Sequence, residues 1–186
     1  MHKFLPSMFI FLDKYNSQVF KNNSTNIGII YRNYNGKKRE IELIKIAKAC
    51  KKTNFKLYVS NNFKLALKVK SDGVYIPSYN NRKIYNNLEN KNLIILGSAH
   101  SQKEIIEKKK QNCHAVFLSP IFHIKKRKKH LGVCKFNLLS LNSKIRLLAL
   151  GGITEKNINK LKILNSKGFG AISLFKKKPA FKRPAL

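Results

Sequence analysis

Short apolar runs alternate along this chain with longer segments in which apolar residues recur every three or four positions. Buried strands of a parallel sheet have continuous apolar sequences, and strands that alternate with helical segments are typical of βαβ units. The pattern predicts eight strands, at residues 8–12, 26–31, 55–60, 73–77, 92–98, 115–119, 145–151 and 170–175.

The segments between these runs have helical periodicity. The clearest covers residues 38–52, where Ile and Leu side chains share one face and lysines occupy the other. Further helices are expected at about 62–70, 101–111, 136–142 and 154–165. In the last of these, Thr154 and Glu155 form a plausible cap and first turn before Ile158, Leu161 and Leu164.

Eight strands separated by helices predict a single (β/α)8 TIM barrel. With 186 residues the chain is short for this fold, which usually needs about 250. We expect it to be shortened at the first connection, residues 14–25, and at the C-terminal helix. The predicted organisation is a barrel over residues 1–175 followed by a basic tail, residues 176–186. A flavodoxin-like open sheet is the structural alternative.

Charge is the most unusual feature of the composition. Lys and Arg total 39 against 8 Asp and Glu, which gives a formal net charge of +31. Such a charge could indicate nucleic-acid binding. The lysines are spread over nearly every segment together with Asn and Ile, however, and dispersed charge favours solvated faces over a specific partner. Only residues 125–130 form a concentrated basic block.

The sequence also bears on location. No apolar run approaches the roughly 20 residues of a membrane helix, and the apolar segment 4–12 is interrupted by Pro6 and Ser7. The three cysteines are an odd number without close pairing, so a disulfide framework is not expected. We therefore expect a cytoplasmic protein with no signal peptide and no membrane partner.

Two short motifs lie where predicted strands end. LGSAHS, residues 96–101, places Ser and His at a strand's carboxyl end, where phosphate could bind; the alternative is that Ser101 caps the next helix and His100 lies on the surface. ALGGIT, residues 149–154, has paired glycines that let backbone N–H groups approach an anion. Its expected partner is the end of the last strand, at Ile172 and Ser173; a simple tight turn is the alternative.

A third motif is the basic loop SPIFHIKKRKKHLG, residues 119–132. The spacing of His123, His130 and Cys134 matches no structural zinc pattern. The only aspartates in the chain are Asp13 and Asp72. A mechanism based on paired carboxylates, or a magnesium ion held by several carboxylates, is therefore not expected.

The runs GSAHS, AVFLSPIF, LGVCKF, ALGGIT and GAISLF, in this order and spacing, resemble thiamine phosphate synthase and the related thiazole tautomerases. The resemblance is strongest over residues 92–175. It implies a TIM barrel of thiamine biosynthesis that couples hydroxymethylpyrimidine diphosphate to a thiazole phosphate and releases magnesium pyrophosphate. It also implies phosphorylated small molecules as partners. Pro120 stands where the tautomerase has its histidine.

The resemblance implies functional residues at matching positions. Arg32 stands at the arginine of the second-strand motif, Ser98 at a pyrophosphate contact, and Arg127 near a loop lysine. The implied catalytic residues are Arg32, Ser98, Lys126 and Arg127; the implied diphosphate contacts are Arg32, Asn61, Ser98, Lys125, Lys126 and Arg127; and the thiazole phosphate would be held by Gly151, Gly152, Ile172 and Ser173.

The chain departs from the family at the two positions that bind magnesium. Asn61 and Asn80 stand at the positions of its two magnesium aspartates. An amide oxygen can bind magnesium but adds no negative charge, so weak binding or none is expected. The leading interpretation is an active or divergent synthase that uses the basic block partly in place of metal. The alternatives are a non-catalytic or regulatory relative that binds a thiamine precursor, a thiazole tautomerase-like protein, and a basic nucleic-acid binder.

Overall fold

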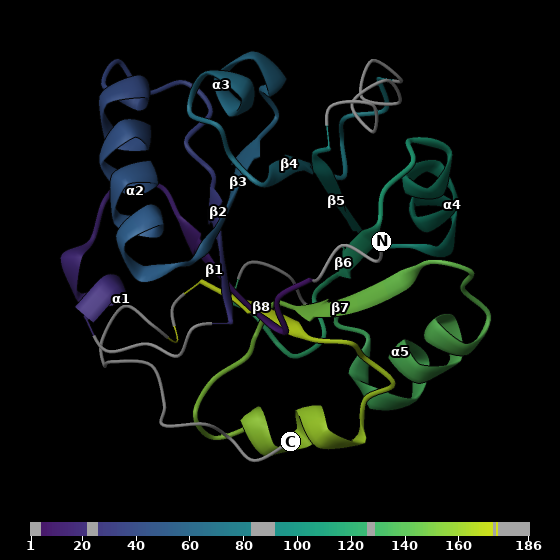
Figure 1. The fold of residues 1–186 in the computed structure, drawn as a ribbon. Helices are drawn as coiled ribbons and strands as arrows, with labels where there is room; N and C mark the ends of the chain where they lie inside the picture. Colours follow the sequence, from purple (N-terminus) through teal and green to yellow (C-terminus); the bar gives the residue numbers. More distant parts are fainter. Residues whose placement is uncertain (1–4, 22–25, 83–91, 126–128, 173, 175–186) are drawn as a thin grey trace.

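The strands close into a barrel. The computed structural model describes residues 5–21, 26–82, 92–125, 129–172 and 174. All eight strands are parallel, follow one another around the barrel in chain order, and are closed by pairing of the last with the first (Figure 1). They are β1 (Met8–Leu12), β2 (Ile27–Tyr31), β3 (Lys56–Ser60), β4 (Gly73–Ile76), β5 (Ile94–Ala99), β6 (Ala115–Leu118), β7 (Arg146–Leu150) and β8 (Phe169–Ala171).

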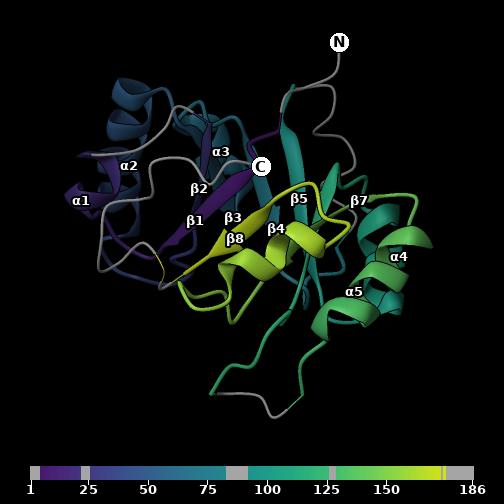
Figure 2. The same cartoon turned by 90° about the horizontal axis from the view of Figure 1, so that it is seen from below.

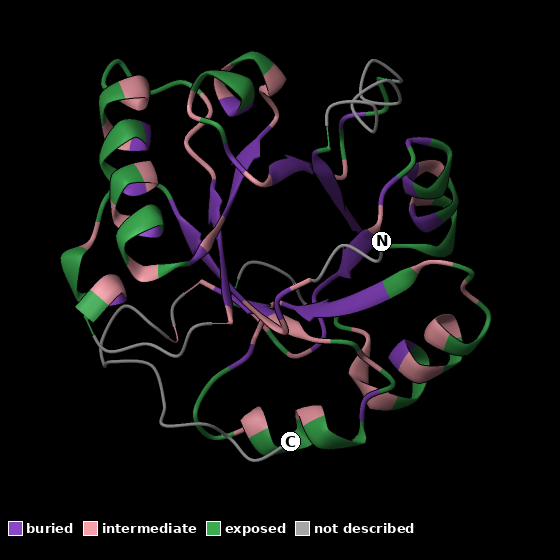
Figure 3. Ribbon diagram, in the orientation of Figure 1, coloured by how far each residue is buried: buried purple, intermediate pink, exposed green. Residues whose placement is uncertain are grey.

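Helices surround this barrel. They are α1 (Ser17–Lys21), α2 (Arg39–Thr53), α3 (Phe63–Lys68), α4 (Gln102–Lys110) and α5 (Gly132–Leu141). Figure 3 shows that the strands are buried almost throughout, whereas the helices bury only their inward faces. The predicted TIM barrel is confirmed. The open-sheet alternative is wrong, because Met8 to Ile10 pair with Phe169 to Ala171 and leave no free edge between β1 and β8.

The first connection is short, as predicted, because α1 has only five residues. The C-terminal tail and the helix expected to be shortened there lie outside the described residues, so the boundary at 175 stays a prediction. In the described part of the chain, no helix combines the length and the apolar character needed to cross a membrane. The cytoplasmic location also stays a prediction.

Two predicted helices need correction. Helix α5 begins at Gly132, four residues before the predicted start. Between β7 and β8 the expected α-helix is wrong: the structure has a turn followed by a 3-10 helix, η2 (Ile158–Ile163). The apolar residues Ile158, Leu161 and Leu164 are spaced by three throughout, which is the period of a 3-10 helix.

Aromatic rings fill the interior of the barrel. Phe117 is central: its ring centroid lies 5.1 Å from that of Phe9 and 5.4 Å from that of Phe11, both with edge-to-face geometry. Glycines on neighbouring strands provide the space for these rings. At Gly170, for example, a Cβ atom would lie 2.8 Å from Phe11 and 2.9 Å from Phe117. This exchange of large and small residues packs the barrel without a channel.

Gly73, at the start of β4, is the glycine at which a Cβ atom would come closest to another atom. A Cβ atom there would lie 2.0 Å from the carbonyl oxygen of Ile94, a backbone atom that cannot rotate away. We expect Gly73→Ala to lower the free energy of unfolding by about 2 kcal/mol or more, through overpacking. Urea unfolding followed by circular dichroism measures this change.

The matched control is Gly132→Asn. Gly132 has a φ of +70° and nothing within 4 Å of the site of a Cβ atom, and Asn tolerates this backbone conformation. The control should change the unfolding free energy by less than about 1 kcal/mol. Equal losses in the two variants would contradict the steric explanation.

Candidate active site at the carboxyl end of the barrel

Polar side chains form a layer above the aromatic interior. Phe11, Ile30 and Leu96 belong to the interior cluster. Side chains two residues further along a strand point to the same side. The next residues on that side are Asp13 and Arg32, which directly follow β1 and β2, and Ser98 in β5. Because all strands are parallel, these positions meet at one end of the barrel, the end at which TIM-barrel active sites lie. We refer to this end as the mouth.

Arg32 is held at the mouth by two neighbours, Phe11 in β1 and Asp13 directly after it. Its Nε donates to Oδ1 of Asp13 over 3.2 Å, and its guanidinium carbon lies 5.9 Å from the centre of the Phe11 ring. The Arg32 backbone N–H also donates to the carbonyl of Leu12 over 2.8 Å. The ion pair is partly exposed and contributes little stability. Its effect is to direct a fixed positive charge at the mouth.

Ser98 lies across the mouth from β2 and is buried in β5. Its hydroxyl lies near the phenol of Tyr75 on β4. Burial raises the pKa of Tyr75, and the neighbouring hydroxyl of Ser98 and the charge of Arg32 oppose this shift. Arg32 and Ser98 therefore act on the same phenol, and Tyr75 is neutral at physiological pH.

Two further tyrosines border the mouth, on the loops that follow β2 and β4. The rings of Tyr34 and Tyr79 are 6.3 Å apart and edge-to-face. Burial raises the pKa of Tyr34 to about 12, and the nearby Tyr79 adds to this shift. The mouth thus offers neutral hydroxyl groups and aromatic faces beside one guanidinium.

Asn61 and Asn80, expected at the metal positions, are in contact. The side-chain amide of Asn80 donates to Oδ1 of Asn61, and Oδ1 of Asn80 accepts the backbone N–H of Arg82 over 2.9 Å. The Asn61 backbone N–H donates to the carbonyl of Tyr75 over 2.9 Å, which ties the pair to β4.

This amide pair does not fit a magnesium ion. Each amide oxygen already accepts a hydrogen bond, and the pair carries no negative charge, whereas magnesium favours carboxylate oxygens. Among the described residues, no group of three His, Cys, Asp or Glu side chains could hold a metal ion. Asp13, the carboxylate at the mouth, is paired with Arg32.

The glycine pair follows β7, and its loop lies beside the loop after β8, because Leu150 pairs with Gly170. Gly151 and Gly152 have φ angles of +90° and +74°. At Gly152 a Cβ atom would lie 2.5 Å from the carbonyl oxygen of Phe122. The approach of the loop after β6 is therefore a structural reason for this glycine, independent of any phosphate.

The remaining predicted residues are less well defined. Ile172 is partly buried, and its side chain packs against the barrel interior. Lys125 is exposed, at the end of the segment 119–125 that follows β6 and extends away from the barrel in Figure 2. Lys126, Arg127 and Ser173 lie outside the described residues. Their roles in binding phosphate therefore stay predictions.

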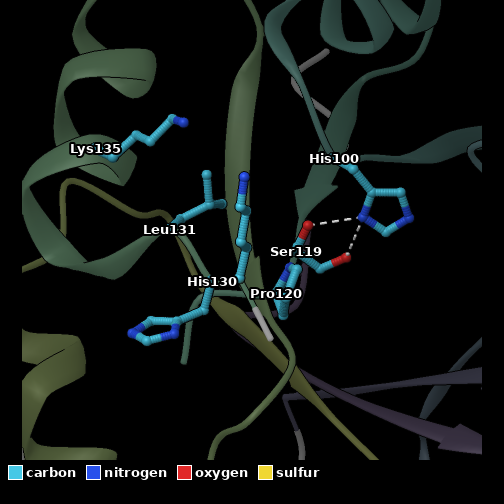
Figure 4. Close-up of a pocket in the computed structure, with 7 residues that line it drawn as sticks. His100, Ser119, Pro120, His130, Leu131 and Lys135 are labelled. Carbon is cyan, nitrogen blue, oxygen red and sulfur yellow. Dashed lines mark hydrogen bonds between the residues drawn. The ribbon is translucent and has the colours of Figure 1, made fainter. Parts of the chain in front are cut away.

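The LGSAHS motif combines a cap with a side cavity. Ser101 caps α4 by accepting the N–H of Glu104 over 3.3 Å, as the structural alternative predicted. His100 lies beside a cavity of about 470 Å³ with Ser119, Lys129 and Lys135 (Figure 4). Nδ1 of His100 is 2.7 Å from the Ser119 carbonyl and 3.1 Å from its hydroxyl.

This geometry does not allow His100 to activate Ser119 as a nucleophile. A carbonyl oxygen can only accept, so Nδ1 of His100 carries the proton in the shorter bond. An Nδ1 that already holds a proton cannot accept one from the Ser119 hydroxyl. The pair therefore fixes the ends of β5 and β6 to each other and does not activate Ser119.

Comparison with known proteins supports the resemblance. The family model described as thiamine monophosphate synthase, TMP-TENI, matches residues 20–175. The chain belongs to the thiamine monophosphate synthase family. A thiamine-phosphate synthase of Prochlorococcus marinus subsp. pastoris is 33% identical over 135 residues, which cover 71% of this chain and 38% of that protein. A putative thiamine-phosphate synthase 2 of Aquifex aeolicus is 29% identical over 143 residues, covering 74% of this chain and 77% of that protein.

A solved structure shares the fold of this family member. Thiamine phosphate pyrophosphorylase from Pyrococcus furiosus matches with a TM-score of 0.71 and 21% identity, over 91% of this chain and 86% of that chain. At this identity the likeness is evidence for the fold alone. The chain spans 38% of the length of the Prochlorococcus relative, so the activity of the whole relative does not transfer to it directly.

Sequence reasoning missed one residue that organises the mouth of this family member. The guanidinium of Arg39, the first residue of α2, donates to the carbonyls of Tyr34 and Ser60 over 3.0 and 3.1 Å. Its own carbonyl accepts the hydroxyl of Tyr31 over 2.8 Å. Arg39 thus joins the ends of β2 and β3. Arg39 follows two lysines at the start of a helix, and nothing in the local sequence distinguishes it from them.

The buried tyrosines of this family member should make the folded state less stable at high pH. Burial is the largest cause that raises the pKa of four tyrosines above the ordinary value of about 10: Tyr31, Tyr34, Tyr58 and Tyr75. Their folded pKa lies above the unfolded one, so their contribution to stability is complete below pH 10 and is lost as pH rises beyond it. The free energy of unfolding should therefore fall above about pH 10.

Ultraviolet absorbance, recorded as the pH is raised, measures the ionisation of the tyrosines. In the native protein, a fraction of the tyrosines should ionise only together with unfolding, and in urea all should ionise in one step. A native titration that coincides with the titration in urea would contradict the burial of these phenols.

Proposed function

We propose that this chain is a thiamine-phosphate synthase that couples hydroxymethylpyrimidine diphosphate to thiazole phosphate. The observation that carries the proposal is the placement of Arg32, held by Asp13 and Phe11, at the same end of the barrel as Ser98, in a chain matched by the family model over residues 20–175. The mouth combines a fixed positive charge, neutral hydroxyl groups and aromatic faces. These groups suit a planar heterocycle that carries a diphosphate.

In the proposed reaction the bond between the pyrimidine methylene carbon and the diphosphate oxygen breaks. The electron pair leaves with the diphosphate, and the thiazole nitrogen supplies the pair that forms the new C–N bond. Arg32 would stabilise the charge that develops on the leaving group through charge-assisted hydrogen bonds. Ser98 would donate a hydrogen bond to the same group, with Tyr75 orienting its hydroxyl.

The thiazole phosphate would bind in the loops after β7 and β8. Gly151 and Gly152 present backbone without side chains, which lets an anion approach N–H groups closely. Ile172 and Ser173 would complete the site through their backbone. Lys125, Lys126 and Arg127 would add positive charge around the diphosphate.

A second function is favoured by one observation. Asn61 and Asn80 form a neutral amide pair at the positions where the resemblance implies metal-binding aspartates. A chain without those carboxylates could bind a thiamine precursor and not turn it over. Formation of thiamine phosphate separates the two functions, because a non-catalytic relative binds the pyrimidine diphosphate with no product.

Arg32 provides the most direct test of the site. Arg32→Met should lower kcat/KM for thiamine phosphate formation about 100-fold, the typical loss for one transition-state donor. Ser98→Ala should lower it by a smaller factor. The control is Arg146→Met, which removes an exposed arginine at the first residue of β7, the opposite end of the barrel. That variant should retain wild-type kinetics. A similar loss in both arginine variants would contradict a role for the mouth.

Metal dependence is the second test. We expect the pyrimidine diphosphate to bind with an affinity that changes little when a chelator is added, because the Asn61–Asn80 pair does not fit magnesium. A triple Ala variant of Lys125, Lys126 and Arg127 should weaken this binding, since it removes charges that neutralise the diphosphate. Isothermal titration calorimetry measures both effects. Tight binding that requires magnesium and ignores the triple substitution would show the proposal to be wrong.

A further inference from the structure

One lysine is fully buried between α4 and the barrel. Lys108 has an exposed fraction of 0%, whereas the other lysines of the described residues lie at the surface. Its Nζ donates to the backbone carbonyl of Asn80 over 2.6 Å and to Oε1 of Gln111 over 2.9 Å. Both acceptors are neutral. Burial lowers the pKa of Lys108, which reflects the cost of keeping an ammonium away from water.

The strand beneath provides space for this side chain. At Gly97, in the middle of β5, a Cβ atom would lie 3.0 Å from Cδ of Lys108 and 3.0 Å from Sγ of Cys113. The stem of the lysine therefore crosses the outer face of β5 at Gly97 before its Nζ reaches Asn80. A glycine here has a specific packing reason, because a larger residue would displace the stem of Lys108.

Gln111, the C-cap residue of α4, binds the same backbone carbonyl as Lys108. Its side-chain Nε2 donates to the carbonyl of Asn80 over 3.0 Å and to the carbonyl of Arg82 over 2.9 Å. Three hydrogen bonds from α4 thus hold the backbone at residues 80 and 82. Gln111 itself is almost fully buried, with an exposed fraction of 2%.

The held backbone determines how the Asn80 side chain is oriented. Oδ1 of Asn80 accepts the N–H of Arg82, so its amide group is the donor that faces Asn61. Asn61 in turn bonds to the carbonyl of Tyr75 through its backbone. A continuous set of hydrogen bonds therefore runs from Lys108, outside the barrel, to the mouth.

We propose that Lys108 is a positioning residue that fixes the loop after β4 against the mouth through the carbonyl of Asn80. It touches neither substrate nor reacting atoms. It acts by holding the Asn61–Asn80 pair in one arrangement, so that the mouth is preformed for the diphosphate. The part of this inference that concerns the diphosphate rests on the proposed function, whereas the part that concerns the loop does not.

A buried apolar residue would fill the same space at a lower desolvation cost. Replacing buried charged groups by apolar ones of similar volume is often neutral or stabilising. If Lys108 served only packing, Lys108→Met would leave the loop unchanged. If it positions the loop, Lys108→Met should retain the fold and loosen residues 77–82.

Hydrogen–deuterium exchange of the wild type and of Lys108→Met makes this comparison. We expect backbone amides in residues 77–82 to exchange about tenfold faster or more in the variant, and the strands β4 and β5 to keep their protection. The matched control is Lys109→Met, which removes an exposed lysine from the next position of α4. Unchanged exchange at 77–82 in a folded Lys108→Met variant would overturn the proposal.

Gln111→Glu gives a second measurement that stability alone cannot explain. It keeps the size of the side chain and gives Lys108 a carboxylate, but it removes the donor to the carbonyls of Asn80 and Arg82. The new carboxylate would repel the carbonyls of Asn80 and Arg82, so we expect faster exchange at 77–82 while the strands β4 and β5 keep their protection. Gly97→Ala, which displaces the stem of Lys108, should also give faster exchange at residues 77–82. This variant replaces Lys108→Met in the experiment if Lys108→Met does not fold.

Kinetics then connect the loop to the site. In Lys108→Met we expect KM for the pyrimidine diphosphate to rise about tenfold and kcat to change by less than about threefold. A looser loop with unchanged KM would overturn the effect on the site. If the wild type forms no thiamine phosphate, the proposed function fails, and the exchange experiment alone decides whether Lys108 positions the loop.

Discussion

The pairing of β1 with β8 is the constraint on which the rest of this structure depends. It joins Met8 to Ile10 with Phe169 to Ala171, and it converts a row of parallel strands into a ring. Only in a ring do the carboxyl ends of β2 and β5 face each other across an enclosed space. Arg32 and Ser98, which are far apart along the chain, act on the same phenol because of this closure.

Closure also explains the composition of the barrel interior. A small ring leaves space for side chains but not for a channel, and here Phe9, Phe11 and Phe117 occupy that space with edge-to-face contacts. Glycines on the adjacent strands accommodate the rings. The aromatic layer forms the floor of the mouth, so the polar groups above it lie on a rigid apolar support.

The mouth differs from a metal-centred site in how its polar groups are held. The carboxylate of Asp13 is paired with Arg32, and the amides of Asn61 and Asn80 bond to each other. Charge is thus supplied by basic side chains, and position by amide and hydroxyl hydrogen bonds. This arrangement agrees with a family member whose phosphate chemistry depends on fixed cations, as proposed above.

Sequence patterns determined the elements of this protein and the end of the barrel at which its polar motifs lie. Continuous apolar runs predicted the strands to within a few residues, because burial on both faces of a parallel strand leaves a direct trace in the sequence. The resemblance to the family rested on motifs of the same kind, such as ALGGIT, each within one short segment. The helix predicted at 154–165 failed because a spacing of three also fits a 3-10 helix.

Tertiary structure alone decided the contacts that organise the mouth. Arg39 and Lys108 look like any other basic residue of a helix, and the bond between Asn61 and Asn80 joins two loops. The barrel brings such groups together through strand closure and helix packing, which involve residues distant in sequence. Local patterns record which face of an element is buried, but they do not record the partner that a polar group meets there, because that partner is set by the three-dimensional arrangement of the whole barrel.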